Sequence, residues 1–273
     1  MIKKKLMNTL FVFFLQNSII AINITAINSQ GIRSDFKNAN HPHKNPTNGQ
    51  RVKKPLCISL GRGCSPALNL RSLKLRTAAY PFDWLISPLT ALVNGLQDDF
   101  KHLLNNCKLR PDKKGVIDSY GFQFVHDWPT VNQPVIDAIN TDFITDSIIS
   151  NEWKKALPQV KEKYRRRIER FKNACLGSEK IFFFRTDDMT KEQAVYLKTF
   201  LSNKFPSLNF ILIIVSHNKQ SWQIDGIKNF QISAFHDPKA WKKALKQLSP
   251  EFDDIEVLQD KSYRECYPLC NHY

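Results

Sequence analysis

Cys64 stands where a thiol can act as a nucleophile. The apolar run 56–60 and a glycine-containing turn precede it, and Ser65-Pro66 opens a helical pattern directly after it. A thiol at a helix N-terminus faces unpaired N–H groups and the positive end of the helix dipole, which both favour the thiolate. We predict that Cys64 is the nucleophile, with a small buried side chain as the alternative. Cys57 lies inside the apolar run, so of the two cysteines we expect Cys57 to have the structural role.

A thiolate nucleophile needs a base that can also return the proton, and histidine is the usual one. His126 lies near the end of the aromatic-rich run 120–128, which would hold the imidazole in a fixed position. His217 directly follows an apolar run, and strand ends are where open α/β sheets bind ligands. We predict His126 as the base and keep His217 as the second candidate.

Two carboxylates are candidates for orienting the imidazole. Asp83 stands between two aromatic rings in the run 80–84, and Asp127 directly follows His126. A carboxylate beside aromatic rings is costly to bury unless it is paired. The alternative for Asp83 is a helix cap or a turn. We expect Trp84, from the same run, to contact the substrate.

Arginines and a further carboxylate are candidates for binding the substrate. Arg185 and Asp187 follow the phenylalanines at 182–184, and Arg167 lies in a basic helical stretch. A guanidinium can bind a carboxylate or phosphate through two hydrogen bonds. The alternatives are a helix cap for Asp187 and a solvated helix face for the basic stretch.

The pattern of apolar residues predicts the elements that position these side chains. We predict strands at 56–60, 77–80, 181–184, 210–215 and 227–232, one or two strands within 116–125, and helices from Ser65 and at 88–106, 151–175, 191–203 and 238–248. Two of the strands are apolar throughout, which is typical of a sheet covered on both faces. We predict a single α/β domain over 55–250, with a mixed or mostly parallel sheet flanked by helices.

The net charge of +15 is concentrated in two segments. Residues 1–55 carry nine basic and one acidic side chain, residues 154–172 carry nine basic and two acidic ones, and the remainder is balanced. A neutral globule with a basic leader and a basic helix does not indicate a nucleic-acid partner. With 42% hydrophobic residues, the composition also excludes a mostly disordered or fibrous chain.

The sequences near the two chain ends predict a cleaved leader, a linker and an irregular tail. Lysines at 3–5 precede an apolar run at 6–22, which predicts a cleaved signal peptide over 1–26. We therefore expect export to the periplasm or the extracellular space, with no stable membrane span after cleavage; an uncleaved anchor is the alternative. Residues 27–54 predict a disordered linker, and 251–273 an irregular tail.

The sequence predicts no cofactor and no metal. Its nine glycines form neither a dinucleotide-binding fingerprint nor a Walker signature. His41 and His43 lack further ligands, and Cys266, Cys270 and His272 lack a second ligand pair at usable spacing. In an exported protein, a Cys266–Cys270 disulfide is an alternative for the tail.

Taken as a set, these motifs resemble a known family. S-L-G-x-x-C before a helix, Y-P-F-D-W, G-F-x-F-x-H-D, Y-x-x-R-I-x-R-F and a strand ending in F-R-T follow one another within 56–215. The set is similar to the uncharacterised family described as papain-like cysteine peptidases. The resemblance implies Cys64 as nucleophile and His126 as base, and an α+β papain-like fold as the alternative architecture. It leaves the third group open between Asp83 and Asp127.

These observations favour an exported thiol hydrolase or acyltransferase that acts on a peptide, an amide or another small acyl substrate. One alternative is an α/β transferase that binds an anionic donor through Arg185 and the Arg-rich helix. The other is a non-catalytic secreted binding module. Separation of the Cys64 sulfur from every histidine nitrogen by more than roughly 7 Å would favour the binding module. The sequence does not define an oligomeric state.

Overall fold

The computed structural model describes residues 55–132 and 148–258, apart from 178, 219–221, 223 and 235. They fall within one compact unit that begins at Val52. The predicted signal peptide and linker, most of the predicted tail, and the Cys266–Cys270 pair lie outside the described residues. No helix of the described part is both long enough and apolar enough to cross a membrane.

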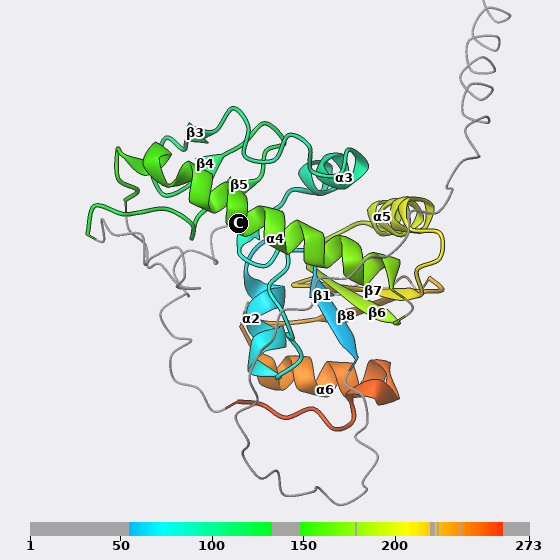
Figure 1. The fold of residues 1–273 in the computed structure, drawn as a ribbon. Helices are drawn as coiled ribbons and strands as arrows, with labels where there is room; N and C mark the ends of the chain where they lie inside the picture. The colour runs from blue at the N-terminus through cyan, green and yellow to red at the C-terminus, as the bar shows by residue number, and fades with distance from the viewer. Residues whose placement is uncertain are drawn as a thin grey trace, which may run out of the picture. The chain divides into compact units, whose positions relative to one another are not determined.

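Four parallel strands form the main sheet (Figure 1). Their order is β1 (Leu56–Ser59), β6 (Ile181–Thr186), β7 (Phe210–Ser216) and β8 (Ile227–Gln231). Every neighbouring pair is parallel, so the carboxyl ends of all four strands meet at one edge of the sheet. Ligands of open α/β sheets bind at that edge.

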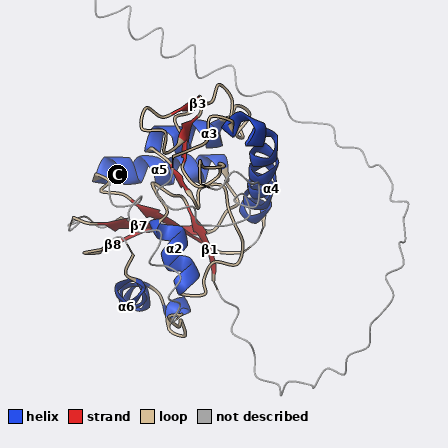
Figure 2. Ribbon diagram, turned by 90° about the vertical axis from the view of Figure 1, so that its left-hand side faces the viewer, coloured by secondary structure: helices blue, strands red, loops and turns tan. Residues whose placement is uncertain are grey.

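Helices cover both faces of this sheet (Figure 2). Phe182 and Phe184 of β6 pack in a cluster with residues of two helices, α2 (Ser65–Ser72) and α6 (Pro238–Leu248). Ile181 and Phe183 point the other way, into a cluster with α4 (Leu157–Leu176) and α5 (Lys191–Lys204). Because both faces are buried, the strand is apolar over its first four residues, 181–184. The predicted α/β fold, a parallel sheet flanked by helices, is confirmed.

A second, smaller sheet is antiparallel. Its order is β2 (Leu85–Ile86), β5 (Gln123–Phe124), β4 (Val116–Ile117) and β3 (Lys108–Leu109). The prediction of one or two strands within 116–125 holds, but the sheet as a whole was not predicted. Strands of two residues are too short to show an alternating pattern.

Two predicted elements are wrong or too long. Residues 77–80 form no strand, because the carbonyl of Tyr80 closes a turn with the Asp83 N–H and the N–H of Tyr80 donates to the Asp83 carboxylate. The helix predicted at 88–106 is α3 (Leu89–Gln97) and ends nine residues early. The chain then turns through left-handed residues, among them Phe100 with a φ of +63°, which places that ring in the core.

The helix predicted at 151–175 consists of a 3-10 turn, η2 (Trp153–Ala156), followed by α4. Pro158 lies in the first turn of α4, where a missing N–H costs no hydrogen bond. It marks the start of the helix and does not bend it. After α6 comes a further 3-10 turn, η3 (Pro250–Phe252), and the described chain continues to residue 258.

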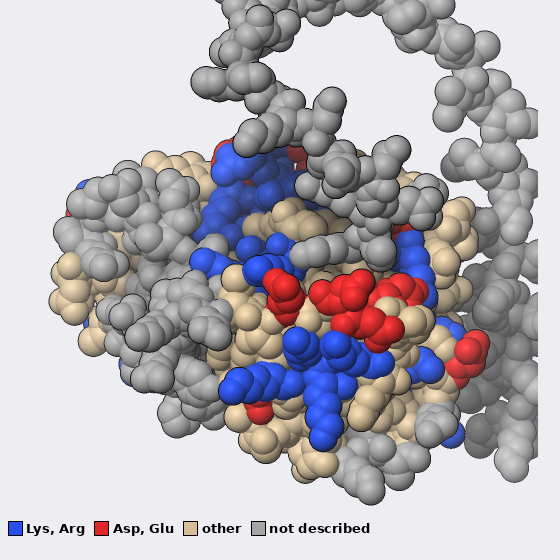
Figure 3. Space-filling model, turned by 90° about the horizontal axis from the view of Figure 1, so that it is seen from below, with Lys and Arg blue, Asp and Glu red and all other residues tan. Residues whose placement is uncertain are grey.

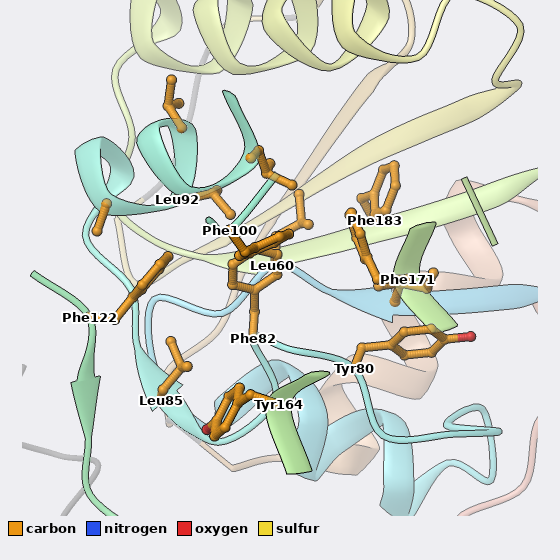
Figure 4. Packing of buried hydrophobic residues seen from close by; sticks show 14 of the residues in the cluster. Leu60, Tyr80, Phe82, Leu85, Leu92, Phe100, Phe122, Tyr164, Phe171 and Phe183 are labelled. Carbon is orange, nitrogen blue, oxygen red and sulfur yellow. The ribbon is translucent and has the colours of Figure 1, made fainter. Parts of the chain in front are cut away.

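Phe82 is the centre of an aromatic cluster between the two sheets (Figure 4). Its ring centroid lies 5.6 Å from Phe100, 5.9 Å from Phe122 and 5.8 Å from Phe171 of α4. Aromatic pairs at these separations add to the free energy gained by burial. The Phe82 side chain therefore fixes the segment that continues to Asp83 and Trp84.

The surface charge is mixed in sign. Figure 3 shows Lys and Arg side chains beside a row of Asp and Glu on the face seen from below, the side of α6 in Figure 1. On α4, Arg165 lies 2.7 Å from Glu162 and 3.3 Å from Glu169. The outer face of the basic helix therefore carries exposed ion pairs of the kind that contribute little to stability.

Gly61 lies in the turn that follows β1. We predict that a side chain at this position destabilises the fold. Its φ is +73°, and an added Cβ would lie 2.4 Å from Ser87 Oγ and 2.9 Å from the carbonyl oxygen of Phe82. Gly121 is a matched control, because its φ is +90° but nothing lies within 4 Å of an added Cβ. Gly121→Ala should cost about 1–2 kcal/mol of unfolding free energy, and Gly61→Ala roughly 1–3 kcal/mol more. Equal costs in urea denaturation would contradict this packing.

Candidate active site

Cys64 and His126 meet although 62 residues separate them in the chain. Cys64 Sγ lies 3.1 Å from His126 Nε2, within the reach needed for a base to take the thiol proton. Both side chains are 2% exposed. We call this pair the dyad.

Cys64 is the N-cap residue of α2. Its carbonyl accepts a hydrogen bond from the N–H of Leu68 at 3.0 Å, but its side chain caps no N–H of the helix. The sulfur is instead directed to His126. No side chain therefore caps the start of α2, where Pro66 has no N–H to donate, and the positive end of the helix follows Cys64 directly in the chain.

Ser87 and Arg185 hold the turn that leads to Cys64. Ser87 Oγ accepts from the N–H of Arg62 at 2.8 Å and donates to the carbonyl of Leu60 at 3.3 Å. Arg185 donates from Nη1 to the carbonyl of Leu60 at 3.2 Å and from Nη2 to that of Ser87 at 3.0 Å. These bonds hold Arg62 in the left-handed region, with a φ of +79°, against its conformational cost.

Arg185 is fully buried and pairs with Asp187. Its Nε and Nη2 donate to Asp187 Oδ2 at 3.1 and 2.6 Å. Burial lowers the pKa of Arg185, and the Asp187 charge opposes this. The sequence predicts that both residues bind substrate. In the structure they instead support the turn before Cys64, and the N–H groups of Arg185 donate to oxygens of the protein itself.

Asp127 is buried against α4. Tyr164 Oη donates to Asp127 Oδ2 at 2.9 Å, and Lys163 Nζ lies 3.0 Å from Oδ1. Burial raises the pKa of Asp127, but the charges of Lys163 and Arg167 and the hydrogen bonds more than offset it, so that the pKa lies below its ordinary value. Asp127 is therefore a buried carboxylate paired with side chains of α4.

Asp83 is buried beside Arg76. Its Oδ2 accepts from Arg76 Nε at 2.9 Å and from the N–H of Tyr80 at 2.9 Å. Burial raises the pKa of Asp83, although Arg76 and the hydrogen bond from Tyr80 lower it in part. Asp83 thus closes a turn, the alternative kept for it from the sequence, and also forms an ion pair.

Arg167 lies among these buried groups. It is 3% exposed, its charge lowers the pKa of both Asp83 and Asp127, and its guanidinium stacks 5.2 Å from the centroid of the Tyr164 ring. The structure therefore places Arg167, predicted to bind substrate, in a buried position on the Tyr164 ring, where its charge acts on two carboxylates of its own chain. We call Arg76, Asp83, Asp127, Lys163 and Arg167 the buried charge network.

Neither Asp83 nor Asp127 is hydrogen-bonded to the second nitrogen of His126. His126 Nδ1 is buried and has no hydrogen-bond partner within the described ranges. Trp84 is the aromatic neighbour of the imidazole, with ring centroids 6.4 Å apart and planes at 86°. Trp84 is itself 2% exposed, so the structure places this predicted substrate contact against the imidazole.

Comparison with known proteins decides the family. Residues 55–220 match the family described as "Putative papain-like cysteine peptidase (DUF1796)". The chain belongs to this family. An uncharacterized protein of Acanthamoeba polyphaga mimivirus is 26% identical over 182 residues, which is 61% of this chain and 80% of that protein. No solved structure matches.

The family match confirms the resemblance inferred from the motifs, and both residues of the dyad lie within the matched segment. The other described histidines make different contacts. His217, the second candidate base, is exposed and donates its N–H to Asp188 at 2.9 Å. His236 Nε2 lies 3.2 Å from Ser72 Oγ. Within the described ranges, no three His, Cys, Asp or Glu side chains form a possible metal site.

Sequence reasoning did not single out Ser87 or Arg76, which position parts of this candidate site. Ser87 follows a strand of two residues, and nothing in its neighbourhood predicts a contact with the turn at Leu60. Tyr164 and Arg167 carried a weak signal, because residues three apart on a helix share a face, and that face is the buried one.

Replacement of Asp127 by Asn should lower the free energy of unfolding by roughly 3 kcal/mol at pH 7, because it leaves Lys163 and Arg167 without their buried counter-charge. The folded-state pKa of Asp127 lies below the ordinary value of 3.8, so its contribution is present above pH 4 and lost as the pH falls through the folded-state pKa. The gap between wild type and variant should therefore shrink in acid.

Urea denaturation at several pH values measures this gap. Asp112→Asn is the control, because Asp112 pairs with Arg110 at 2.7 Å with 40% of its side chain exposed, and such a pair contributes under about 1 kcal/mol. A gap that does not change with pH, or a cost equal to that of the control, would contradict the pairing.

Proposed function

We propose that this chain is a thiol-dependent hydrolase of the cysteine peptidase type, with Cys64 as nucleophile and His126 as base. The observation that carries the proposal is the 3.1 Å contact between Cys64 Sγ and His126 Nε2. The family to which the chain belongs supports it through its description. The substrate class that we propose is a peptide, an amide or another small acyl compound.

The dyad would act in two steps. His126 Nε2 takes the proton of Cys64 Sγ, and the thiolate attacks the carbonyl carbon of the substrate. The tetrahedral intermediate collapses to a thioester as the leaving amine takes the proton back from His126. Water then attacks the thioester with His126 again as base, which releases the acid and restores the thiol.

The developing oxyanion needs donors near the sulfur. The uncapped N–H groups at the start of α2 are the backbone donors next to Cys64 in the chain, and donors of this kind supply a large part of the stabilisation in acyl transfer. Gly61 and the bonds from Ser87 and Arg185 fix the turn before Cys64. The turn therefore fixes the position of the thiol relative to these donors.

The alternative, a transferase, needs Arg185 to bind the anionic donor, but this guanidinium is already bonded within the protein. The Arg185 guanidinium donates to the carbonyls of Leu60 and Ser87 and to the Asp187 carboxylate, and it is fully buried. An incoming phosphate would have to break these bonds. We therefore favour the thiol hydrolase.

Export stays part of the proposal. The lysines at 3–5 and the apolar run at 6–22 support a cleaved signal over 1–26. Sequencing of the N-terminus of the mature protein from an exporting host tests it, because cleavage should leave a new N-terminus close to residue 27. A mature chain that begins at Met1 would contradict cleavage.

Alkylation of individual cysteines by iodoacetamide tests the nucleophile. At pH 6.5 we predict that wild type is modified at Cys64 at least about tenfold faster than at Cys57 or Cys175, because a nearby imidazole favours the thiolate. Burial raises the pKa of Cys57, and that of Cys175 to about 12, so those two thiols stay protonated. Peptide mass spectrometry resolves the sites.

Two variants complete this test. Cys57→Ala is the control and should leave the modification of Cys64 unchanged, whereas His126→Asn should slow it at least about tenfold. Both side chains of the dyad are buried, so a bulky maleimide should react more slowly than iodoacetamide. Equal labelling of Cys64 in wild type and His126→Asn would refute the assignment of the base.

Hydrolysis of a peptide library tests turnover. Cys64→Ala should lower kcat by about a thousandfold or more, the usual cost of removing a nucleophile that acts as a unit with its base. Cys57→Ala should keep wild-type turnover. Equal hydrolysis by wild type and Cys64→Ala would show that the activity does not depend on the thiol.

A further inference from the structure

Within the described residues, the imidazole of the dyad has no hydrogen bond to its second ring nitrogen. A catalytic histidine is ordinarily held through its second ring nitrogen by a carboxylate or an amide. Here His126 Nδ1 is buried without a hydrogen-bond partner in the part of the chain that the structure describes. Among the described residues, a contact other than a hydrogen bond to Nδ1 must therefore keep the ring directed at Cys64.

Trp84 is placed to do this. Its ring meets that of His126 at 86°, with centroids 6.4 Å apart, the edge-to-face arrangement that aromatic pairs favour. Such a contact depends on the angle between the rings and so resists rotation of the imidazole. Both side chains are 2% exposed, so water does not compete for the contact.

Trp84 is held in turn by Arg76. The guanidinium carbon of Arg76 lies 5.4 Å from the centroid of the Trp84 ring, within the range of a cation–π interaction. Arg76 Nε donates to Asp83 Oδ2 at 2.9 Å, and the side chains of this pair are 13% and 2% exposed. A planar guanidinium fixed by a buried carboxylate is a rigid surface for the indole.

We infer that Trp84 is a positioning residue for His126, and that Asp83 acts on the dyad through Arg76 and Trp84 and not by a direct hydrogen bond. This inference rests on the proposed function of the dyad. It gives each residue of the Phe82-Asp83-Trp84 run a separate role. Phe82 anchors the run in the aromatic cluster, Asp83 fixes Arg76, and Trp84 contacts the imidazole.

Asp127 does not take this role, although it is next to His126 in the chain. Its two oxygens face Tyr164 Oη and Lys163 Nζ on α4. These bonds fix the backbone that carries His126, but they leave the rotation of the imidazole free. The contact with Trp84 restricts that rotation.

The test compares Trp84→Leu with Trp84→Phe through the pH dependence of iodoacetamide alkylation at Cys64. In Trp84→Leu, we expect the rate at pH 6 to fall about tenfold and the profile to move towards that of a free thiol, whose pKa is about 8.5. Trp84→Phe keeps an aromatic edge and should stay within about threefold of wild type. Arg76→Lys keeps the charge for Asp83 but loses the planar surface, so its profile should fall in between.

Trp153→Leu is the matched control. Trp153 is 5% exposed and packs edge-to-face on Trp128 at 5.1 Å. Its replacement should lower the melting temperature as much as Trp84→Leu does but leave the pH profile in place. A Trp84→Leu profile that superimposes on wild type, or an equal shift in Trp153→Leu, would overturn the inference.

A second readout separates this inference from the proposed function. If Cys64 of the wild type reacts no faster at pH 6 than a free thiol, the proposed function fails. The ring-proton NMR signals of His126 then still report the contact, because the Trp84 ring current displaces them. We expect this displacement to be lost in Trp84→Leu and kept in Trp153→Leu, and unchanged signals in Trp84→Leu would refute the positioning role.

Discussion

The contact between Cys64 and His126 is the constraint on which the rest of the site depends, because its two partners come from different sheets. Cys64 follows β1 of the parallel sheet, and His126 follows β5 of the antiparallel one. A shift of about an ångström between the sheets would break the hydrogen bond. The aromatic cluster around Phe82 and the bonds of Arg185 and Ser87 to the Cys64 turn oppose such a shift.

The buried charge network supports the same arrangement at an energetic cost. Charged groups in a protein interior rarely stabilise a fold more than well-packed apolar side chains do. Asp127 ties the backbone of His126 to α4 through Tyr164, and Asp83 fixes Arg76 beneath Trp84. We interpret the network as a device that fixes geometry and that contributes to stability only while all its members are present.

The sequence predicts the main sheet well because its strands carry their own signal. Residues 181–184 and 210–215 are apolar on both faces, a pattern that is needed only where a sheet is covered on both sides. The antiparallel sheet carries no such signal, since each of its strands has two residues. The helix after Pro88 was predicted too long because Phe100 and Leu104 continue its apolar spacing, although they reach the core through turns.

Cys64 and His126 could be proposed from the sequence because position in the chain determines their chemistry: one begins a helix and the other ends an aromatic run. The roles of Trp84, Arg167, Arg185 and Asp187 depend on contacts between distant residues. Arg185 bonds a carbonyl 125 residues away, and no local pattern predicts such a bond. A buried arginine and a substrate-binding arginine look alike in a sequence.

The thiolate absorbance of Cys64 as a function of pH tests the central contact most directly, as the difference at 240 nm between wild type and Cys64→Ala. The account predicts that thiolate is present at Cys64 at pH 6, well below the ordinary pKa of about 8.5 for a free thiol. It also predicts that His126→Asn loses this absorbance while it keeps the wild-type circular dichroism spectrum. A wild-type Cys64 that ionises only near pH 8.5, or an unchanged curve in His126→Asn, would contradict a thiol paired with its base.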